Sequence, residues 1–438
     1  MKIELVAPAV EDSAFLKHLA VATLAGLTPK DVDVSFKDDL VTRLDPSTDL
    51  DFSVDLAAIT ASTKTVARAY ELAAAYRAHG VRVVMGGIHP TVLPEEVLEH
   101  CDAVVVGEAE GLWDRVVEDA RSGTLSRLYR RDSLPDYKTP TRPRRDIFKS
   151  KRYVPMDIVQ ASRGCPFDCD FCSVTQFFGR SFRVRDVEDT IDEVRGLKGH
   201  WLMFADDNIV GIPAHSLKLF EALKPLRVTW FGQASLHGLS KEATVKQLAA
   251  SGCKALFIGF ESVSPASLKG CGKNQNNPAK YVDSVRMLQD NGVAVWASFV
   301  LGLDEDDESI FDGTLDFALK APLFMASFAM LTPYPGTRLY KRLADEGRLL
   351  QDRWWLRKDR DDSPLYRPKH MSPDKLHEGW QHVWREFYSK RSILSRFYGS
   401  SFSSFWTALA YLPVNLKQRR LTTEKILGGN KHFLRDRS

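Results

Sequence analysis

Three cysteines stand close together in the segment ASRGCPFDCDFCSV, at Cys165, Cys169 and Cys172. Gaps of three and two residues let one tight loop aim three thiolates at a single point. Such a loop can bind a metal. With only three protein ligands, one coordination position stays open for a reactant, as catalytic metal sites require.

Two kinds of metal centre remain possible for this loop. A structural zinc site takes four ligands, and an ordinary iron–sulfur cluster also takes four cysteines. On a [4Fe–4S] cluster, three cysteines leave one iron without a protein ligand, so the fourth ligand can be the reactant itself. The alternative is a zinc knuckle or a structural cluster that recruits one of the scattered cysteines, Cys101, Cys253 or Cys271.

The composition narrows the class of protein. A chain of 438 residues predicts two or three domains, and a net charge of only +3 gives no argument for a nucleic-acid partner. No apolar run reaches the length of a membrane span, and the N-terminus does not resemble a signal peptide. We therefore expect a cytoplasmic protein whose thiols stay reduced, which favours metal binding over disulfides.

The elements of residues 1–130 predict a Rossmann-like α/β domain. Short apolar runs at 2–7, 56–60 and 81–85 alternate with a helix over 65–80. Buried strands separated by helices imply a parallel sheet covered on both faces, with ligands beyond the carboxyl ends of the strands. In this domain those ends carry Gly86, Gly87, His89, Gly107 and Glu108.

The rest of the chain divides into three parts. Residues 131–153 are rich in proline and charge and predict a linker. Residues 154–345 contain six strand–helix units, fewer than the eight of a full barrel, so a six-unit partial (β/α) barrel is expected. The three cysteines follow its first strand, on the face where barrels keep their chemistry.

Residues 346–438 predict a mostly helical C-terminal region. Ser372 and Pro373 begin a helix, whose apolar stripe indicates either core packing or an apolar substrate: Leu376, Trp380, Val383, Trp384 and Phe387. In 402–420, Phe402, Phe405, Trp406 and Leu409 share one face and a basic run follows. That segment is a candidate interfacial helix for peripheral membrane contact.

The segment CPFDCDFC resembles the C-x3-C-x-aromatic-C signature of the radical S-adenosylmethionine (SAM) enzymes, with Phe171 as the aromatic residue. The resemblance implies that Cys165, Cys169 and Cys172 hold a [4Fe–4S] cluster whose open iron is chelated by SAM. One electron then cleaves a carbon–sulfur bond of SAM and releases the 5′-deoxyadenosyl radical.

The same resemblance implies SAM contacts at the ends of the later barrel strands: Asp206, Asp207, Asn208, Gln233, Ser235, Glu261, Ser262, Val300 and Leu303. It also suggests Tyr334 and Arg338, in LTPYPGTRLY, as residues that reach the substrate. The alternative is structural, because strand-end residues of these types also form turns, helix caps and salt bridges.

The whole chain is similar to the cobalamin-binding subclass of radical SAM proteins, and its C-terminal third is closest to the hopanoid-methylase-like branch. The resemblance implies cobalamin contacts in the first domain: Thr60, Ser62, Thr63, Gly86, Gly87, His89, Gly107 and Glu108. The cobalt-ligating D-x-H-x-x-G motif is missing, since the corresponding region has Asp12 but no such histidine spacing. The alternative is that these residues simply form turns after strands.

These observations predict a cobalamin-dependent radical SAM C-methyltransferase that acts on an apolar, lipid-like or natural-product small molecule. An external electron donor of the flavodoxin or ferredoxin type is expected, and a nucleic acid is not. Two alternatives stay open: radical chemistry without methyl transfer, such as coupling, cyclisation or rearrangement, and a non-catalytic iron–sulfur carrier or sensor.

Overall fold

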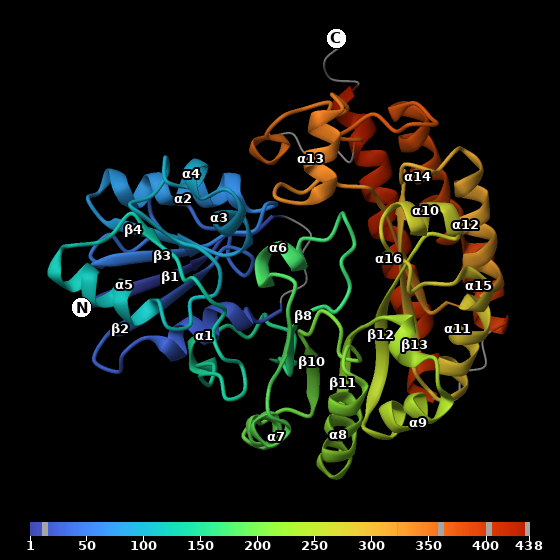
Figure 1. Ribbon diagram of the computed structural model, residues 1–438, viewed down its shortest axis with the longest axis horizontal. Helices are drawn as coiled ribbons and strands as arrows, with labels where there is room; N and C mark the ends of the chain where they lie inside the picture. Colours follow the sequence, from blue (N-terminus) through green and yellow to red (C-terminus); the bar gives the residue numbers. More distant parts are fainter. Residues whose placement is uncertain (11–15, 322, 358–362, 400–404, 434–438) are drawn as a thin grey trace.

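The structure, a computed structural model, describes residues 1–10, 16–321, 323–357, 363–399 and 405–433. Two sheets lie beside each other in Figure 1, one in the blue N-terminal part and one in the green-to-yellow part. Both consist of parallel strands only, with helices packed against them. The predicted α/β fold class is confirmed.

The first sheet has the strand order β2-β1-β3-β4-β5-β6. Helices cover both of its faces, as the sequence predicts: α1 (Leu19–Leu27) and α5 (Trp113–Ser122) on one, and α2 (Val66–Ala78), α3 (Ile88–Val92) and α4 (Pro94–Val97) on the other. The strands are β1 (Lys2–Ala7), β2 (Asp33–Asp38), β3 (Leu56–Thr60), β4 (Arg82–Gly86), β5 (Ala103–Val105) and β6 (Leu128–Tyr129).

Helix α2 shows why this sequence builds a covered sheet. Val66, Ala69 and Tyr70 are buried against the sheet, as their spacing predicts, and Gly80 beyond the helix end adopts φ +78°. Ala74, which we expected on the same face, is exposed, and Tyr76 is buried instead. The apolar face is therefore rotated slightly from its predicted position.

The second sheet has six parallel strands in chain order, which confirms the partial barrel. The strands are β7 (Asp157–Val159), β10 (Trp201–Phe204), β11 (Thr229–Ala234), β12 (Cys253–Glu261), β13 (Ala294–Leu301) and β14 (Met325–Met330). The connecting helices are α7 (Val187–Arg195), α8 (Pro213–Leu223), α9 (Glu242–Ala250), α10 (Pro265–Gly270), α11 (Tyr281–Asp290) and α12 (Ser309–Lys320).

The side chains of each barrel strand alternate between two environments. In β10, Leu202 and Phe204 are buried in the core formed with the helices. The alternate residues Trp201 and Met203 point to the opposite, inner face, and Trp201 remains 54% exposed. The inner face of the curved sheet therefore keeps apolar side chains accessible.

The C-terminal region is helical, with α13 (Arg338–Asp345), α14 (Pro373–Phe387), α15 (Lys390–Gly399) and α16 (Phe405–Phe433). The Ser372 hydroxyl accepts a hydrogen bond from the Lys375 amide, so the predicted helix start is confirmed. The predicted apolar stripe of α14 packs into the barrel core, where Leu376 and Val383 are fully buried. Core packing is thus the correct interpretation of that stripe.

The segment 349–357 crosses back to the first domain. Trp354 and Trp355 pack in the core cluster beneath α2, and the Trp355 indole donates to the Glu96 carboxylate at 3.0 Å. The predicted boundaries after residues 130, 153 and 345 stay predictions. In the part of the chain that the structure describes, no helix is long and apolar enough to cross a membrane. Phe402 lies outside the described residues, as do the side chains of Phe405 and Trp406.

Candidate active site

The cysteine loop connects the two strands of an antiparallel hairpin, β8 (Ser162–Gly164) and β9 (Phe182–Val184). The sequence did not predict this hairpin. Gly164 adopts φ +87°, and a Cβ there would lie 2.1 Å from the Ser181 carbonyl oxygen. Only glycine fits this position, so the turn into the loop is fixed by the backbone. The short helix α6 (Val174–Phe178) closes the loop.

Helix α13 and the end of α10 hold the cysteine loop from outside. Arg338 donates to the Asp168 carboxylate at 2.6 Å and also to its carbonyl oxygen. Arg342 donates to Asp170 at 2.7 Å, and the Asp170 amide donates to the Cys271 carbonyl at 3.1 Å. Arg338 was predicted to reach the substrate; the structure places it against the loop that carries the cysteines.

Tyr334, the other residue predicted to reach the substrate, lies away from the cysteine loop. It packs with the core cluster of the first domain, and its ring centroid is 5.7 Å from that of Trp354. Its carbonyl accepts the Thr337 hydroxyl, which caps α13. The structure therefore gives Tyr334 a packing position, and its role in the reaction stays a prediction.

Burial sets the electrostatics of the three thiols. Desolvation raises the pKa of all three, and that of Cys172 to about 12. None of the six cysteines is in a disulfide. Because thiolates are the ligand form, positive charge from a bound centre or a nearby cation must offset the cost of burying them.

Among the described ranges, no three His, Cys, Asp or Glu side chains are grouped as a single metal ion would need. The donor set fits a [4Fe–4S] cluster by its chemistry: three thiols on one loop, with a buried lysine, Lys273, electrostatically coupled to them. Lys273 was missed in the sequence, although GFESVSPASLKGCGK contains it.

Two strand-end carboxylates support the hairpin from below. Asp206 is fully buried and accepts hydrogen bonds from the Ala161 amide and the Ser162 hydroxyl. Asp207 accepts the Gly164 amide at 3.1 Å. Desolvation raises the pKa of Asp206 to about 7 and that of Asp207 to about 6. Both predicted SAM contacts thus hold the backbone next to the first cysteine.

Asn208 joins another predicted contact residue, Ser235, to the cysteine loop. Its amide nitrogen donates to the Ser235 hydroxyl at 3.1 Å and lies 4.0 Å from the Cys165 sulfur. Its amide oxygen accepts the Ser235 backbone amide at 3.0 Å. Gln233 is the penultimate residue of β11, the strand that leads to Ser235, and it is half-buried. The ends of β10 and β11 therefore meet at the cysteine loop.

Glu261 lies at an irregular point of β12. Its φ is +63°, and the register with β13 shifts between Gly259 and Glu261. Its carboxylate accepts the Lys273 ammonium at 2.8 Å. Ser262 is buried and accepts the Ser264 amide in the turn that leads to α10.

The last predicted SAM contacts lie at the end of β13. Val300 is half-buried and Leu303 is buried. The amides of Gly302 and Leu303 donate to the Asp306 carboxylate at 3.0 and 2.9 Å, which forms a tight turn at the strand end. Both residues remain candidates for contact with the adenine.

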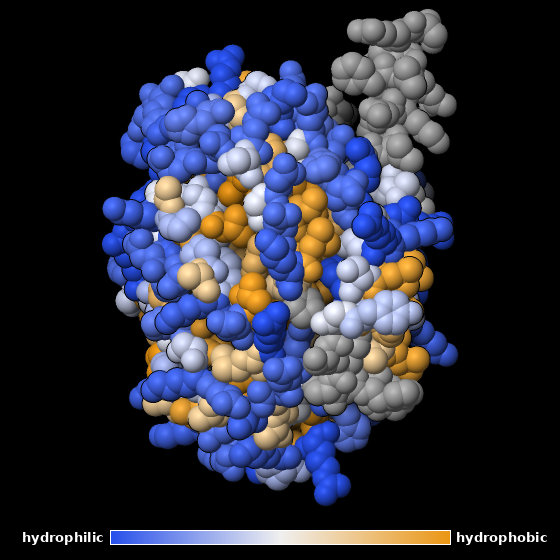
Figure 2. Space-filling view, turned by 90° about the vertical axis from the view of Figure 1, so that its right-hand side faces the viewer, coloured by the Kyte–Doolittle hydropathy of each residue, from blue (hydrophilic) through white to orange (hydrophobic). Residues whose placement is uncertain are grey.

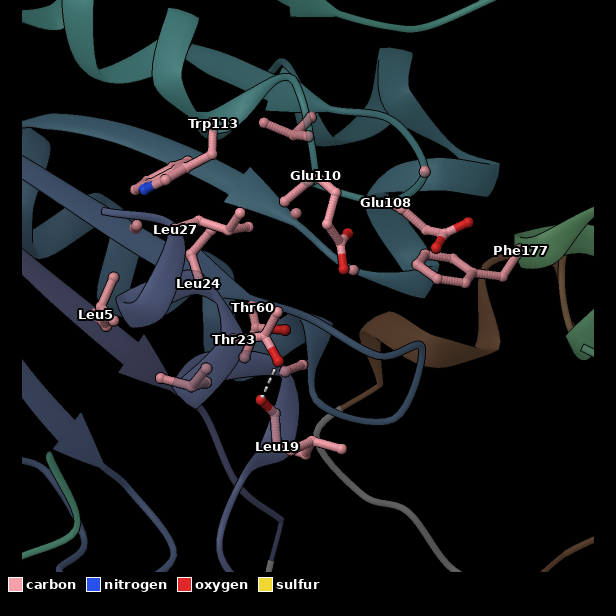
Figure 3. Close-up of a pocket in the computed structure, with 18 of the residues that line it drawn as sticks. Leu5, Leu19, Thr23, Leu24, Leu27, Thr60, Glu108, Glu110, Trp113 and Phe177 are labelled. Atoms are coloured by element: carbon pink, nitrogen blue, oxygen red, sulfur yellow. Dashed lines mark hydrogen bonds between the residues drawn. The ribbon is translucent and has the colours of Figure 1, made fainter. Parts of the chain in front are cut away.

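A cavity of about 310 Å³ lies between the two sheets. Figure 3 shows apolar side chains of α1 and α5 at one end of it, and Glu108 with Phe177 toward the other. Five predicted cobalamin contacts line it: Thr60, Gly86, Gly87, Gly107 and Glu108. The second domain contributes Gln160, Arg163, Phe177, Phe178 and Ala205.

Three other predicted cobalamin contacts, Ser62, Thr63 and His89, are not part of this wall. His89 is fully buried, with Nε2 at 3.1 Å from Glu96 and Nδ1 at 3.4 Å from the Thr63 hydroxyl. Ser62 is in a turn with Thr65. The imidazole therefore faces the interior of the first domain.

The wall of the cavity fits a large ring-bearing group. Gly107 adopts φ +82° and has open space where a Cβ would be. A Cβ on Gly87 would lie 2.7 Å from the Ala61 carbonyl oxygen. The lining is otherwise mainly apolar, with few polar groups such as Thr60 and Glu110. Backbone that approaches closely and an apolar floor are what a corrinoid with a buried tail requires.

Comparisons with known proteins agree with this arrangement. Residues 159–318 match the radical SAM superfamily, residues 19–117 the B12 binding domain, and residues 337–410 a domain of unknown function (DUF4070). The chain is 31% identical over 95% of its length to the bacteriochlorophyllide d C-12(1)-methyltransferase of Chlorobaculum tepidum, and it covers 92% of that protein. The chain belongs to the radical SAM superfamily, in its cobalamin-binding subclass.

A second relative is the bacteriochlorophyllide d C-8(2)-methyltransferase of the same organism, 30% identical over 77% of this chain and 78% of its own. The structure of the cobalamin-dependent SAM radical enzyme OxsB, with aqua-cobalamin and SAM bound, has a TM-score of 0.71 and 15% identity. It covers 96% of this chain and 71% of its own, which shows the shared fold. The predicted family and cofactors, a [4Fe–4S] cluster, SAM and cobalamin, are confirmed.

Proposed function

We propose that this radical SAM enzyme transfers a methyl group to an unactivated carbon of a large, flat, apolar small molecule of the tetrapyrrole class. The observation that carries the proposal is the position of the cavity. One wall is the strand-end edge of the B12-binding sheet, and the other contains Arg163 and Phe177. In the sequence, Arg163 precedes the three cysteines and Phe177 follows them.

When bound, SAM on the cluster supplies the adenosyl radical that removes a hydrogen atom, and cobalamin supplies the methyl group that replaces it. The residues of this chain bind and orient those groups. Asp206, Asp207 and Asn208 fix the hairpin and the first cysteine, and α13 fixes the loop from the other side. Gly87 and Gly107 let the first domain approach a bulky ring.

The inner face of the barrel sheet supports an apolar ring substrate. The Trp201 ring stacks on Phe231 with centroids 5.8 Å apart, and Phe257 meets Trp296 edge-on at 5.2 Å. Trp296 is 40% exposed on this face, and Trp201, 54% exposed, begins β10 at the strand end away from the cysteine loop. Accessible aromatic faces bind flat conjugated rings by stacking. Both reported relatives are named for action on a bacteriochlorophyllide.

The experiment is anaerobic turnover with SAM that carries a deuterated methyl group. Enzyme reconstituted with iron, sulfide and cobalamin receives a strong reductant and a chlorin substrate. We expect 5′-deoxyadenosine together with a product heavier by one labelled methyl group on carbon. Formation of 5′-deoxyadenosine without a labelled product would favour coupling, cyclisation or rearrangement. Failure to take up a corrinoid would contradict methyl transfer.

The reducing electron comes from a flavodoxin- or ferredoxin-type donor in this proposal, because the cluster needs a low-potential one-electron partner. Reduced flavodoxin in place of the chemical reductant is expected to support formation of 5′-deoxyadenosine. A cluster that accepts electrons from dithionite but from neither protein donor would contradict this part of the proposal.

The C-terminal helices also support a peripheral contact with an anionic membrane. Residues 387–423 contain no Asp or Glu, and Lys390, Arg391, Lys417 and Arg420 are exposed there. Exposed apolar side chains accompany them: Leu394, Tyr398, Leu409, Leu416 and Leu421. Figure 2, which looks onto the side with α11, α12 and α15, shows apolar side chains gathered between hydrophilic ones. This combination is typical of interfacial helices.

Co-sedimentation with vesicles that contain anionic lipid tests the membrane contact. Leu416→Asp in the full chain is expected to weaken binding, because it places a negative charge on the exposed face of α16. The matched control is Leu128→Asp, an exposed leucine on the edge strand β6. Equal binding by the wild type and both variants, or no binding by any, would contradict the proposal.

A further inference from the structure

Lys273 lies directly behind the cysteine loop. The segment that carries it contacts the loop backbone, since the Cys271 carbonyl accepts the Asp170 amide at 3.1 Å. A Cβ on Gly272 would lie 3.3 Å from the Asp168 carbonyl oxygen and 3.9 Å from Cys169 Cα. The Lys273 side chain itself is only 12% exposed.

The fold distorts a barrel strand to give Lys273 its partner. Glu261 has a left-handed backbone, which is uncommon for a residue with a side chain, and β12 loses register with β13 at this point. A Cβ on Gly259 would lie 2.2 Å from the Glu261 carboxylate and 3.1 Å from the Lys273 ammonium. The missing side chain of Gly259 thus leaves the space that the ion pair fills.

The charges around Lys273 keep it protonated. Burial alone would lower its pKa, but attraction to the Glu261 carboxylate and to the thiolate forms of Cys169 and Cys165 outweighs burial and raises the pKa above the usual value. The Glu261 carboxylate and the thiolates are all anionic, so Lys273 is the positive charge that faces both of them. The positive charge of Lys273 acts to lower the pKa of each of the three cysteines, against the effect of their burial.

We propose that Lys273 sets the reduction potential of the cluster: its fixed positive charge stabilises the reduced form, and Glu261 limits that effect. The potential of an iron–sulfur cluster depends on nearby charge and on burial, and a charge in a poorly hydrated site acts strongly over a few ångströms. Lys273 acts only through its charge, and it takes no part in electron transfer or group transfer. The inference rests on the proposed function only in placing a cluster on the three cysteines.

The test is a potentiometric titration of the reconstituted cluster, followed by electron paramagnetic resonance without SAM or substrate. Lys273→Met removes the charge and is expected to shift the midpoint potential to more negative values. Glu261→Gln removes the opposing charge and is expected to shift it to more positive values. Lys273→Arg keeps the charge and is expected to stay near the wild type.

Lys269→Met is the matched control, because Lys269 is an exposed lysine of α10 four residues away. It is expected to leave the potential unchanged. Iron and sulfide content verifies that each variant holds a full cluster. A wild-type potential in Lys273→Met, or equal shifts in Lys273→Met and Lys273→Arg, would overturn the inference. Failure of the methyl-transfer assay would leave these potentials unaffected, so the two proposals can fail separately.

Discussion

Arg163 in the cysteine hairpin and Glu108 at the edge of the B12-binding sheet form a buried ion pair across the junction of the two domains. The Glu108 side chain is 2% exposed and is also paired with Arg183 of β9. The Arg163 guanidinium lies 4.3 Å from the ring centroid of Tyr137, in the predicted linker. Arg163 lies two residues before the first cysteine and Glu108 lines the cavity, so the ion pair couples the cluster loop to the cavity wall.

Replacing Glu108 with glutamine is expected to destabilise the enzyme and to misalign the two sites. It leaves Arg183 buried without its carboxylate, whereas Arg163 keeps its ion pair with Glu110. Removing one partner of a buried pair costs up to about 3–5 kcal/mol in free energy of unfolding. Urea denaturation measures this loss. In turnover, we expect more 5′-deoxyadenosine per methylated product, because the radical forms while the methyl donor is out of position.

Asp31→Asn is the control for the Glu108 variant. Asp31 pairs with Arg121 on the surface, where its side chain is 67% exposed. Loss of such a pair changes stability by about 0–1 kcal/mol. Equal stability losses in the two variants, or unchanged coupling in Glu108→Gln, would contradict a positioning role for the ion pair.

Replacing Cys169 with alanine is expected to remove the cluster. Cys169 is a buried member of the trio, and the remaining two thiols cannot hold a [4Fe–4S] centre with an open iron. We expect iron content to fall and 5′-deoxyadenosine to become undetectable. Cys253→Ala is the control, since Cys253 lies in the barrel core and should keep full iron content. Cluster retention in Cys169→Ala would contradict the assignment.

Local patterns were enough to predict much of this protein. The spacing of the cysteines, the two sets of buried strands and the cap at Ser372 all depend on residues close together in the chain, where sequence and geometry are directly linked. The strand β2, by contrast, reads DVSFKD at the edge of its sheet. Its half-exposed and charged residues hide the apolar pattern that marks a buried strand.

The unpredicted parts of the site depend on contacts between distant segments. The hairpin strands β8 and β9 are three residues each and pair across the whole cysteine loop. Arg163 meets Glu108 across 55 positions, and Lys273 meets Glu261 at the point where β12 shifts its register with β13. Charge alone could mark these residues as candidates, but their partners follow from the packing of the two domains.

Replacing His89 with alanine is expected to destabilise the first domain without changing the cobalt environment. His89 hydrogen-bonds Glu96, which also accepts from Tyr70 and Trp355, so the variant leaves buried acceptor capacity unpaired at a cost of about 1–3 kcal/mol. The electron paramagnetic resonance spectrum of bound cob(II)alamin should match that of the wild type. The exposed His370→Ala is the control for stability. Loss of a nitrogen coupling in the His89 variant would instead identify it as a cobalt ligand.

Asp206 is expected to make the apoprotein less stable as pH rises. Burial raises its folded-state pKa to about 7, whereas an unfolded aspartate ionises near a pKa of about 3.9. Between these values the folded carboxyl keeps its proton while the unfolded one releases it, so the free energy of unfolding falls by up to about 1.4 kcal/mol per pH unit. Asp206→Asn lacks this dependence. Urea denaturation from pH 4.5 to 7.5 should therefore show the wild-type advantage over Asp206→Asn shrinking steadily, and parallel curves would show that Asp206 is already ionised in the folded protein.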